Sequence, residues 1–257
     1  MDINALHFIM PLFGVVFFSI VEKSLTKNNV ATIKRFFNYF LIYLINFSIN
    51  LVLATFVLIP FIYLISPLKL ASIASLDTPR IYNFIFSFLL IDLAQYINHR
   101  VHHKIPFLWK LHRLHHSEKD VNALTSFLHN PLEILSGFFI VVTIFFIFDI
   151  PIPVIIAYTL ISSVQSAYTH LNILIPEKID KYLRFIIITP NVHRIHHSKD
   201  MKLGNSNFGQ IFIFWDLIFR TFIDKSNKMI HQIEFGIQKN ESPENNSLFS
   251  LLSNPFK

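Results

Sequence analysis

The chain has 257 residues, of which 53% are hydrophobic and only 15% charged, and its mean hydropathy is +0.49. This composition is too apolar for an ordinary soluble domain and indicates a membrane protein. Cysteine is absent, which excludes disulfides, thiolate metal sites, cysteine nucleophiles and iron–sulfur clusters. The net charge of +6 does not indicate nucleic-acid binding, because the basic residues flank apolar runs and form no stripe interleaved with aromatics.

Five apolar stretches predict helices that span or re-enter the membrane, at residues 6–21, 36–65, 81–97, 134–148 and 151–167. The first stretch lacks the positive leader and cleavage site of a secretory signal, so we expect a retained helix. Pro60 should end or kink the second helix. The last two stretches are short and turn at the sequence DIPIP, which fits either two spans or a re-entrant hairpin over residues 134–169.

Loop charges predict the orientation of these helices. The loop after the first helix is rich in basic residues, whereas residues 66–80 carry only two and the DIPIP turn none. Because Lys and Arg are retained on the cytoplasmic side, the N-terminus should lie outside, and residues 99–133 and 170–225 should form one cytoplasmic cap. Residues 226–257 are rich in Asn, Ser, Glu and Lys, and we expect a mobile or surface tail. A bacterial cytoplasmic membrane is favoured over the endoplasmic reticulum membrane of a eukaryote.

Three copies of one histidine pattern occur in the predicted cap. HRVHH at 99–103, HRLHH at 112–116 and HRIHH at 193–197 hold nine of the thirteen histidines. Residues i, i+3 and i+4 share one face of a helix, so each copy presents its imidazoles on one side. An isolated histidine is usually a surface or hydrogen-bonded core residue, but clustered imidazoles repel one another on protonation. The pattern therefore predicts metal binding.

The pattern leaves the metal open, because imidazole suits Zn, Cu, Fe and Ni alike. The number of histidines exceeds what one octahedral ion can bind and indicates two metals. Asp92 and Tyr96 precede His99 by one to two helical turns, so either side chain could orient an imidazole through its second ring nitrogen. Asp216 is a further candidate for a counter-charge outside the ligands, or equally a helix cap or solvated group.

Residues 92–133, 167–198 and 205–222 together resemble the sterol desaturase/fatty acid hydroxylase superfamily. The superfamily's H-x3-H box matches the first copy of the pattern, with His102 as an extra residue, and its two H-x2-H-H boxes match the other copies. Its closing N-[YF]-G and W-D elements match residues 207–209 and 215–216. The metal ligands that the resemblance implies are His99, His103, His112, His115, His116, His170, His193, His196 and His197.

The chain departs from the superfamily pattern at residues 128–130, which read Leu-His-Asn where many members read Arg-Phe-His. His129 therefore lies one place early, and we treat it, like His102, as an extra ligand candidate. The later F-G-T element reads Phe-Arg-Thr at 219–221, and Leu174 replaces a second histidine found in some fatty acid hydroxylases.

The resemblance implies an all-α integral membrane enzyme with two iron ions, which zinc can replace in purified protein. Such an enzyme uses O2 and two electrons to hydroxylate or desaturate a sterol, fatty acyl chain or related lipid. The electrons should come from a separate cytochrome b5-like protein, ferredoxin or reductase, because the sequence has no dinucleotide-binding motif, cysteine or haem domain.

Two alternatives remain beside a lipid oxygenase. Metal transporters usually place ligands near the bilayer midplane in broken helices, whereas these histidines lie outside the apolar runs, which favours an enzyme. A member of the superfamily that performs a non-oxygenase lipid reaction, such as C–O or C–C cleavage, fits the same residues.

Overall fold

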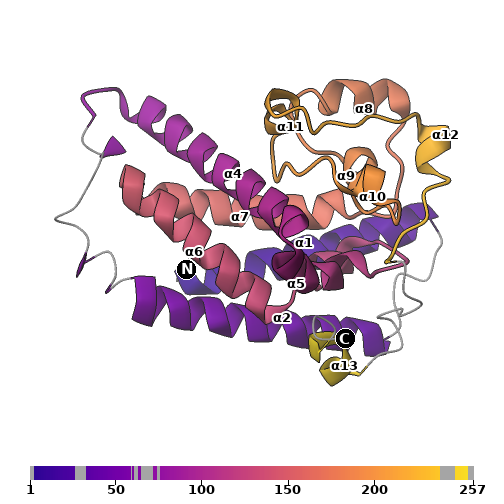
Figure 1. Ribbon diagram of the computed structural model, residues 1–257, viewed down its shortest axis with the longest axis horizontal. Helices are drawn as coiled ribbons and strands as arrows, with labels where there is room; N and C mark the ends of the chain where they lie inside the picture. The colour runs from indigo at the N-terminus through magenta and orange to yellow at the C-terminus, as the bar shows by residue number, and fades with distance from the viewer. Residues whose placement is uncertain are drawn as a thin grey trace.

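A computed structural model describes residues 3–26, 33–58, 60, 63–64, 72–73, 76–237 and 247–253 of the chain. Five helices are long and apolar enough to cross a membrane, in agreement with the five predicted stretches. The fold is therefore that of a multi-pass, all-helical membrane protein (Figure 1). The five helices are α1 (Ile3–Thr26), α2 (Ile33–Leu53), α4 (Arg80–Lys104), α6 (Pro131–Phe148) and α7 (Ile152–Thr169).

Prolines, an N-capping asparagine and a residue in the left-handed region mark the ends of α6 and α7. Asn130 caps α6 by accepting a hydrogen bond from the backbone of Leu132 at 3.0 Å, and Pro131 occupies the first turn. Asp149 ends α6 in the left-handed region (φ 45°), and Pro151 precedes α7. The DIPIP turn is thus a tight connection between two antiparallel helices. Regular α-helix in α2 gives way to a π-helical turn, Ala54–Leu58, short of Pro60.

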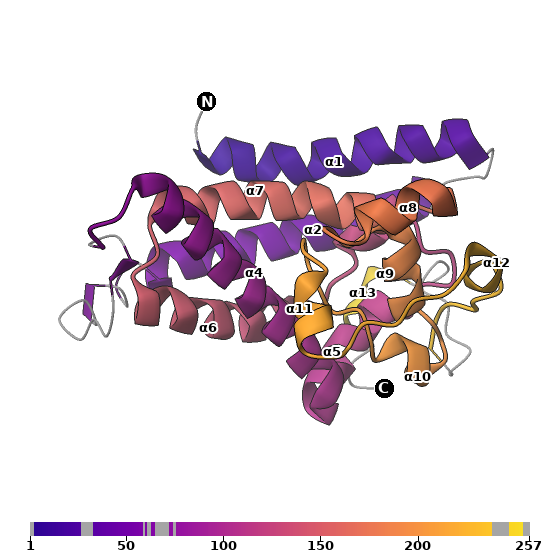
Figure 2. The same cartoon turned by 90° about the horizontal axis from the view of Figure 1, so that it is seen from above.

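The helices meet in pairs and converge at one end of the bundle. α1 packs along α7, while α4 contacts both α6 and α7. The C-terminal ends of α4 and α7 and the start of α6 lie at the same end, beside a group of short helices (Figures 1 and 2). All three histidine boxes therefore reach one side of the bundle, as the loop charges required. The first histidine box, residues 99–103, lies within α4, because this helix continues to Lys104.

Short helices form a cap over this end of the bundle. The segment between α4 and α6 contributes α5 (Pro106–His116) and the 3-10 turn η4 (Ala123–Phe127). Within the described residues the cap contains no strand, only isolated bridges at 187–212 and 198–235. The segment after α7 contributes α8 (Glu177–Leu183), α9 (Pro190–His196), α10 (Met201–Gly204), α11 (Phe214–Ile218) and α12 (Asn227–Ile230).

The predicted surface tail in fact contributes to the core. Leu251 of helix α13 (Leu248–Ser253) is completely buried in a hydrophobic cluster that includes residues of α1, α2 and α5, and the side chain of Asn130 donates to the carbonyl of Leu252 at 3.1 Å. Ile230 in α12 is also fully buried. The expectation of a surface tail therefore does not hold for these residues, because the average composition of the segment is polar although it contains short apolar stretches. Residues 238–246 and 254–257 lie outside the described part.

Candidate metal centre

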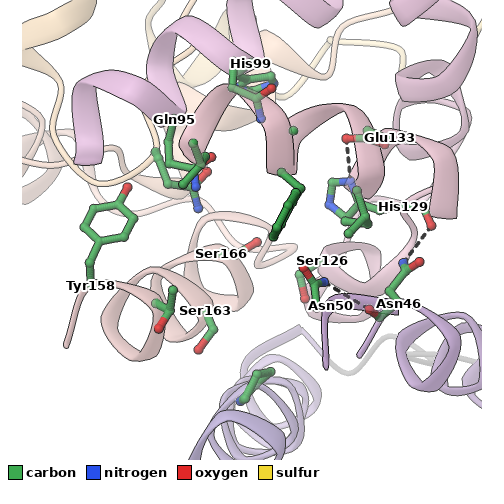
Figure 3. A pocket seen from close by; sticks show the side chains of 18 of the residues that line it. Asn46, Asn50, Gln95, His99, Ser126, His129, Glu133, Tyr158, Ser163 and Ser166 are labelled. Carbon is green, nitrogen blue, oxygen red and sulfur yellow. Dashed lines mark hydrogen bonds and ion pairs between the residues drawn. The ribbon is translucent and has the colours of Figure 1, made fainter. Parts of the chain in front are cut away.

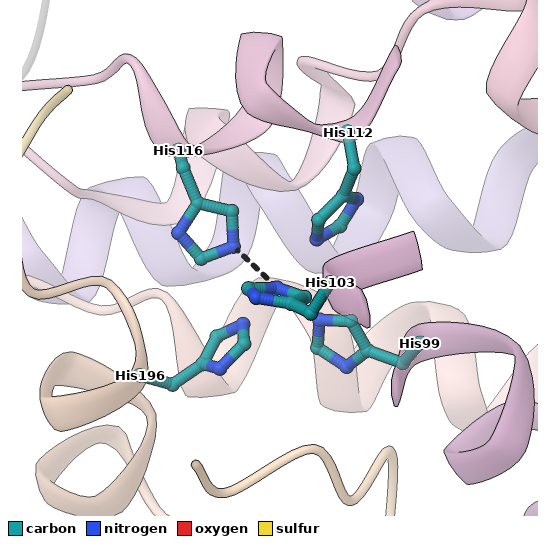
Figure 4. Close-up of side chains that lie close together, drawn as sticks. All are labelled: His99, His103, His112, His116 and His196. Carbon is teal, nitrogen blue, oxygen red and sulfur yellow. Dashed lines mark hydrogen bonds between the residues drawn. The ribbon is translucent and has the colours of Figure 1, made fainter. Parts of the chain in front are cut away.

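Two groups of histidines, all buried except the partly buried His99, lie where the bundle meets the cap. Within each group, one potential ligand atom from every residue lies within 4.8 Å of the others. Together the two groups contain all nine histidines that the sequence predicted as ligands. The first group, shown in Figure 4, consists of His99, His103, His112, His116 and His196. The second group consists of His115, His170, His193 and His197.

The two H-x2-H-H boxes divide their histidines between the groups. On α5, His115 turns to the second group while the other two histidines of its box turn to the first. On α9, His196 joins the first group, while the other two join the second. The rings of His116 and His197 stack at 4.5 Å across the boundary, so the groups are neighbours. Thr189 and Pro190 start α9 as N-cap and first residue, which sets the direction of its histidines.

Backbone carbonyls and one carboxylate orient the first group. His99 Nδ1 lies 2.9 Å from the carbonyl of Phe208, and His196 Nδ1 lies 2.7 Å from that of Ser206. A carbonyl only accepts, so each Nδ1 donates and each Nε2 carries a lone pair. Both Nε2 atoms are buried without a hydrogen-bond partner among the described residues. Metal-binding imidazoles have this arrangement, with one nitrogen anchored and the other bare.

The second group brings four Nε2 atoms together. The Nε2 of His170 lies 3.0 Å from that of His115, 3.0 Å from that of His193 and 3.1 Å from that of His197. The last two are themselves 3.1 Å apart. Nitrogens bound to one ion at about 2.1 Å, with adjacent bonds at right angles, lie about 3.0 Å apart. The spacing therefore fits one shared cation.

Burial favours the neutral form of several of these imidazoles. It lowers the pKa of His170 and His196 to about 3. Burial, reinforced by neighbouring imidazoles, also holds the pKa of His115, His116 and His193 well below the usual value of 6.5. Neutral imidazole is the form that binds metal, so both groups can hold a metal ion at neutral pH.

Glu133 is a site residue that the sequence analysis did not single out. Its Oε1 accepts from His112 Nδ1 at 2.8 Å and from His129 Nδ1 at 3.0 Å. Among the described residues it is the one carboxylate hydrogen-bonded to histidine, and its Oε2 is buried without a partner. The spacing of four residues from His129, just before α6, to Glu133 in its first turn was the available signal. Glu133 thus fixes the ring of a histidine in the first group.

The two extra ligand candidates lie outside both groups. His102 uses both ring nitrogens elsewhere, with Nδ1 2.8 Å from the carbonyl of Asn98 and Nε2 2.8 Å from the hydroxyl of Ser136. His129 binds Glu133 and stacks on His115 with ring centroids 4.3 Å apart. With His112 and Glu133 it forms a third set of closely spaced donor atoms.

Asp92 and Tyr96 do not orient an imidazole, contrary to the hypothesis from their spacing. Asp92 accepts from Tyr158 at 2.7 Å and from Trp215 Nε1 at 2.9 Å, and it also binds two backbone N–H groups of the segment before α11. Tyr96 pairs with the hydroxyl of Thr221 at 2.8 Å. Both residues therefore connect α4 to the part of the cap around α11, and no histidine is among these hydrogen-bond partners.

Asp216 acts on the first group through the backbone. It accepts from the N–H groups of Phe208 and Gly209, both at 2.8 Å, and from the hydroxyl of Thr221 at 2.7 Å. The carbonyl of Phe208 in turn holds His99. A Cβ at position 209 would approach the carbonyl oxygen of Phe212 to 2.6 Å, so only glycine fits this turn.

A cavity of about 610 Å³ runs from the histidines into the membrane helices (Figure 3). Both groups open onto it, through His99 of the first and His170 of the second, among others. Its apolar wall comes from α2, α4, α6 and α7. His7 lines it as well and is paired with Thr159 at 2.7 Å, as expected for an isolated, hydrogen-bonded histidine. The cavity can therefore bring an apolar chain from the bilayer to the metal centre.

Known proteins resemble the chain over the same region. Human alkylglycerol monooxygenase is 28% identical over 158 residues, which cover 59% of this chain and 33% of that protein. Ornithine lipid hydroxylase OlsE of Rhizobium tropici is 26% identical over 56% of this chain and 43% of its own length. Human cholesterol 25-hydroxylase is 26% identical over 55% of this chain and 51% of its own. The chain thus matches only a third to a half of each relative.

No solved structure gives a significant match. The fatty acid hydroxylase family matches residues 84–221, more than half of the chain, and this region contains both histidine groups. The histidine boxes, their convergence beside a membrane cavity and this match agree, and the chain belongs to the fatty acid hydroxylase family.

Proposed function

We propose that the chain is an iron-dependent enzyme that uses O2 to hydroxylate or desaturate a membrane lipid. The observation that carries this proposal is the opening of two groups of closely spaced imidazoles onto a cavity within the membrane helices. The printed names of the relatives support it, since they describe lipid hydroxylases and a monooxygenase.

The nine histidines are proposed as ligands of two metal ions, one in each group. The nearly equilateral triangle of Nε2 atoms of His170, His193 and His197 has edges of 3.0–3.1 Å. Edges of this length would allow all three nitrogens to bind one cation. We propose that this cation is iron, although zinc can occupy imidazole sites in purified protein.

Two iron ions, when bound and supplied with electrons, would provide the redox chemistry that O2 needs to attack an unactivated C–H bond. The protein's own residues have three tasks. The carbonyls of Phe208, Ser206 and Ser166 and the carboxylate of Glu133 hold four imidazole rings in place. The cavity positions the lipid chain, and its apolar wall excludes water from the reacting carbon.

The electron donor is proposed to be a separate carrier, either cytochrome b5-like, a ferredoxin or a reductase, because the sequence lacks cysteine and a dinucleotide-binding motif. The site is proposed to face the cytoplasm. Exposed lysines of the cap, such as Lys104, Lys110 and Lys119, support this orientation. Metal transport is less favoured, because both groups lie at one end of the bundle beneath the cap.

Metal analysis and comparative lipid mass spectrometry test the proposal together. The detergent-purified protein should carry about two metal ions per chain, one for each histidine group. His196→Ala and His115→Ala should each lower metal content and abolish lipid oxidation, whereas His231→Ala, an exposed histidine outside both groups, should change neither. A lipid that gains one oxygen indicates hydroxylation, and one that loses two hydrogens indicates desaturation. One metal or none in folded protein would refute the two-metal site, and altered lipids without added oxygen or lost hydrogen would indicate a non-oxygenase reaction.

A further inference from the structure

The cap exposes large apolar side chains although it lies outside the five long helices. Phe185 is 72% exposed, Tyr182 66% and Ile218 62%. Single exposed apolar residues are normal on soluble proteins, whereas a contiguous group of them marks a surface that contacts a partner or a membrane. We call this group the cap patch, and it consists of Ile179, Tyr182, Phe185, Ile186, Leu217 and Ile218.

Backbone hydrogen bonds bring the two segments of the cap patch together. The N–H of Ile213, just before α11, donates to the carbonyl of Ile186 at 3.2 Å, and residues 187 and 212 form an isolated bridge. One turn further along, the N–H of Leu217 donates to the carbonyl of Ile213 at 3.3 Å. α8 and α11 accordingly lie on the same side of the cap (Figures 1 and 2).

Both helices bury charged groups and expose apolar ones, which is the reverse of a helix on a water-facing surface. On α8, Asp180 is completely buried and forms an ion pair with the largely buried Arg184, four residues further on. The exposed side chains of Ile179, Tyr182 and Ile186 follow the i, i+3, i+7 spacing of one helix face. On α11 the buried charged residue is likewise an aspartate, and the two residues after it are exposed and apolar. The cap patch is therefore suited to apolar surroundings.

The segment that leads into α11 contacts α4 within the membrane-spanning part of that helix. The ring centroids of Phe212 and Phe88 lie 6.2 Å apart, and Trp215 Nε1 donates to Asp92 at 2.9 Å. At a rise of about 1.5 Å per residue, Phe88 and Asp92 lie about 16 Å and about 10 Å from His99 along α4, toward the middle of the bundle. This part of the cap therefore reaches the depth of the membrane helices.

The exposed surface of α4 borders the cap patch. Phe219, the residue after α11, stacks on Tyr96 of α4 with ring centroids 5.2 Å apart. The next residue of α4, Ile97, is exposed, as are Ile85 and Phe86 in the first half of the same helix. In a membrane-spanning helix, exposed apolar side chains of this kind contact lipid. The cap patch thus adjoins a surface that already faces the bilayer.

Two lysines accompany the apolar face of α8. Lys178 and Lys181 are both exposed, and the Nζ of Lys181 lies 4.8 Å from the centre of the Tyr182 ring. A lysine beside an apolar surface can lay its hydrocarbon stem along that surface and keep its ammonium group among lipid headgroups. The charges on α8 therefore complement the anionic headgroups of a membrane surface.

We propose that the cap patch inserts into the lipid leaflet on the cap side of the membrane. Its apolar side chains lie among the acyl chains, and the two lysines lie among the headgroups. A water-soluble partner would account for the exposed side chains alone, but not for their continuity with α4. The insertion holds the cap against the bilayer, so the metal centre lies beside the headgroup layer. This inference rests on the membrane-spanning helices and not on the proposed lipid oxidation.

Fluorescent labels at single cysteines test the inference on the metal-containing protein in nanodiscs. The chain has no cysteine of its own, so each variant takes one label. Two quenchers report where a label lies: a nitroxide on a lipid acyl chain reaches labels within the membrane, and iodide reaches labels in water. The patch variants are Tyr182→Cys and Phe185→Cys after the start of α8, and Leu217→Cys and Ile218→Cys on α11, all at exposed positions.

Two further variants calibrate the quenching. Ile85→Cys, exposed on the membrane-spanning part of α4, is the membrane control. Lys202→Cys, exposed on α10, is the water control. All four patch labels should be quenched by the nitroxide lipid as the membrane control is, and they should be protected from iodide relative to the water control.

Two results would overturn the inference. Iodide quenching of any patch label to the level of the water control would show that the patch faces water. Protection of the patch labels from both quenchers would show that a protein surface covers it, such as a second copy of the chain. Each segment carries two labels, so the loss of one variant to misfolding still leaves a result for both segments. The measurement uses no enzyme activity, so a failure of lipid oxidation would refute the proposed function and leave the inserted patch standing.

Discussion

Glu133 offers the sharpest test of how the metal centre is held. Its Oε1 accepts from His112 Nδ1 at 2.8 Å and from His129 Nδ1 at 3.0 Å, in a buried setting. Hydrogen bonds to a charged group contribute about 1.5–3 kcal/mol each, and losing a carboxylate behind a metal-binding imidazole typically costs about 10- to 100-fold in metal affinity. Glu133→Leu removes the acceptor altogether, so we expect the upper part of this range, about 2–3 kcal/mol.

Glu133→Gln separates geometry from charge. The amide oxygen can still accept from His112, so the loss should be about tenfold or less. Affinity is measured by competition with a metal chelator, and Glu234→Gln, an exposed carboxylate paired with Lys199, is the control. Because His112 belongs to the first group, the second group should keep its metal. Unchanged affinity in folded Glu133→Leu protein would show that the carboxylate does not position this ligand.

Three further predictions address the supports of the site and the fold. Asp216→Ala removes the acceptor of three hydrogen bonds and should lower the melting temperature and the metal content, since the turn that holds His99 is released; normal metal content would contradict this role. Leu251→Ala should destabilise the protein by about 2–5 kcal/mol if α13 belongs to the core, measured as thermal unfolding in detergent. Metal-free protein should lose stability as the pH falls below 6.5, by about 1.4 kcal/mol per pH unit for each histidine whose folded pKa is lowered, such as His170 with a pKa of about 3. The reason is that imidazoles of the unfolded chain bind protons in this pH range, whereas the buried imidazoles do not. A melting temperature independent of pH would refute this prediction.

Local spacing carried most of what the sequence could predict. The five apolar stretches correspond to the five long helices, and the i, i+3, i+4 spacing marked eight of the nine histidines in the two groups. His170 came from the family resemblance alone, and His102, which fits the spacing, lies outside both groups. Both signals are short-range, because hydrophobic length and helix periodicity depend only on neighbours in the chain. Even so, spacing could not tell that His115 and His116, adjacent in sequence, would serve different groups.

Long-range packing determined what the sequence could not predict. Asp92 lies on the expected face of α4, but the segment before α11 reaches it from more than a hundred residues away and uses both of its oxygens. Glu133 gave only a spacing signal because its partner His112 lies on another helix.

The division of each H-x2-H-H box explains why the pattern occurs twice, while the first box contributes only to one group. Adjacent histidines at i+3 and i+4 point about 100° apart on a helix, so a helix that lies between two ions can serve both. α5 and α9 each do this, and the stacked rings of His116 and His197, 4.5 Å apart, join them at the boundary. Two helices that contribute to both groups therefore fix the distance between the two proposed metal sites. Exchanging the order of residues 114 and 115 would leave the composition unchanged but turn one imidazole away from the second group, and the metal content of that group should fall.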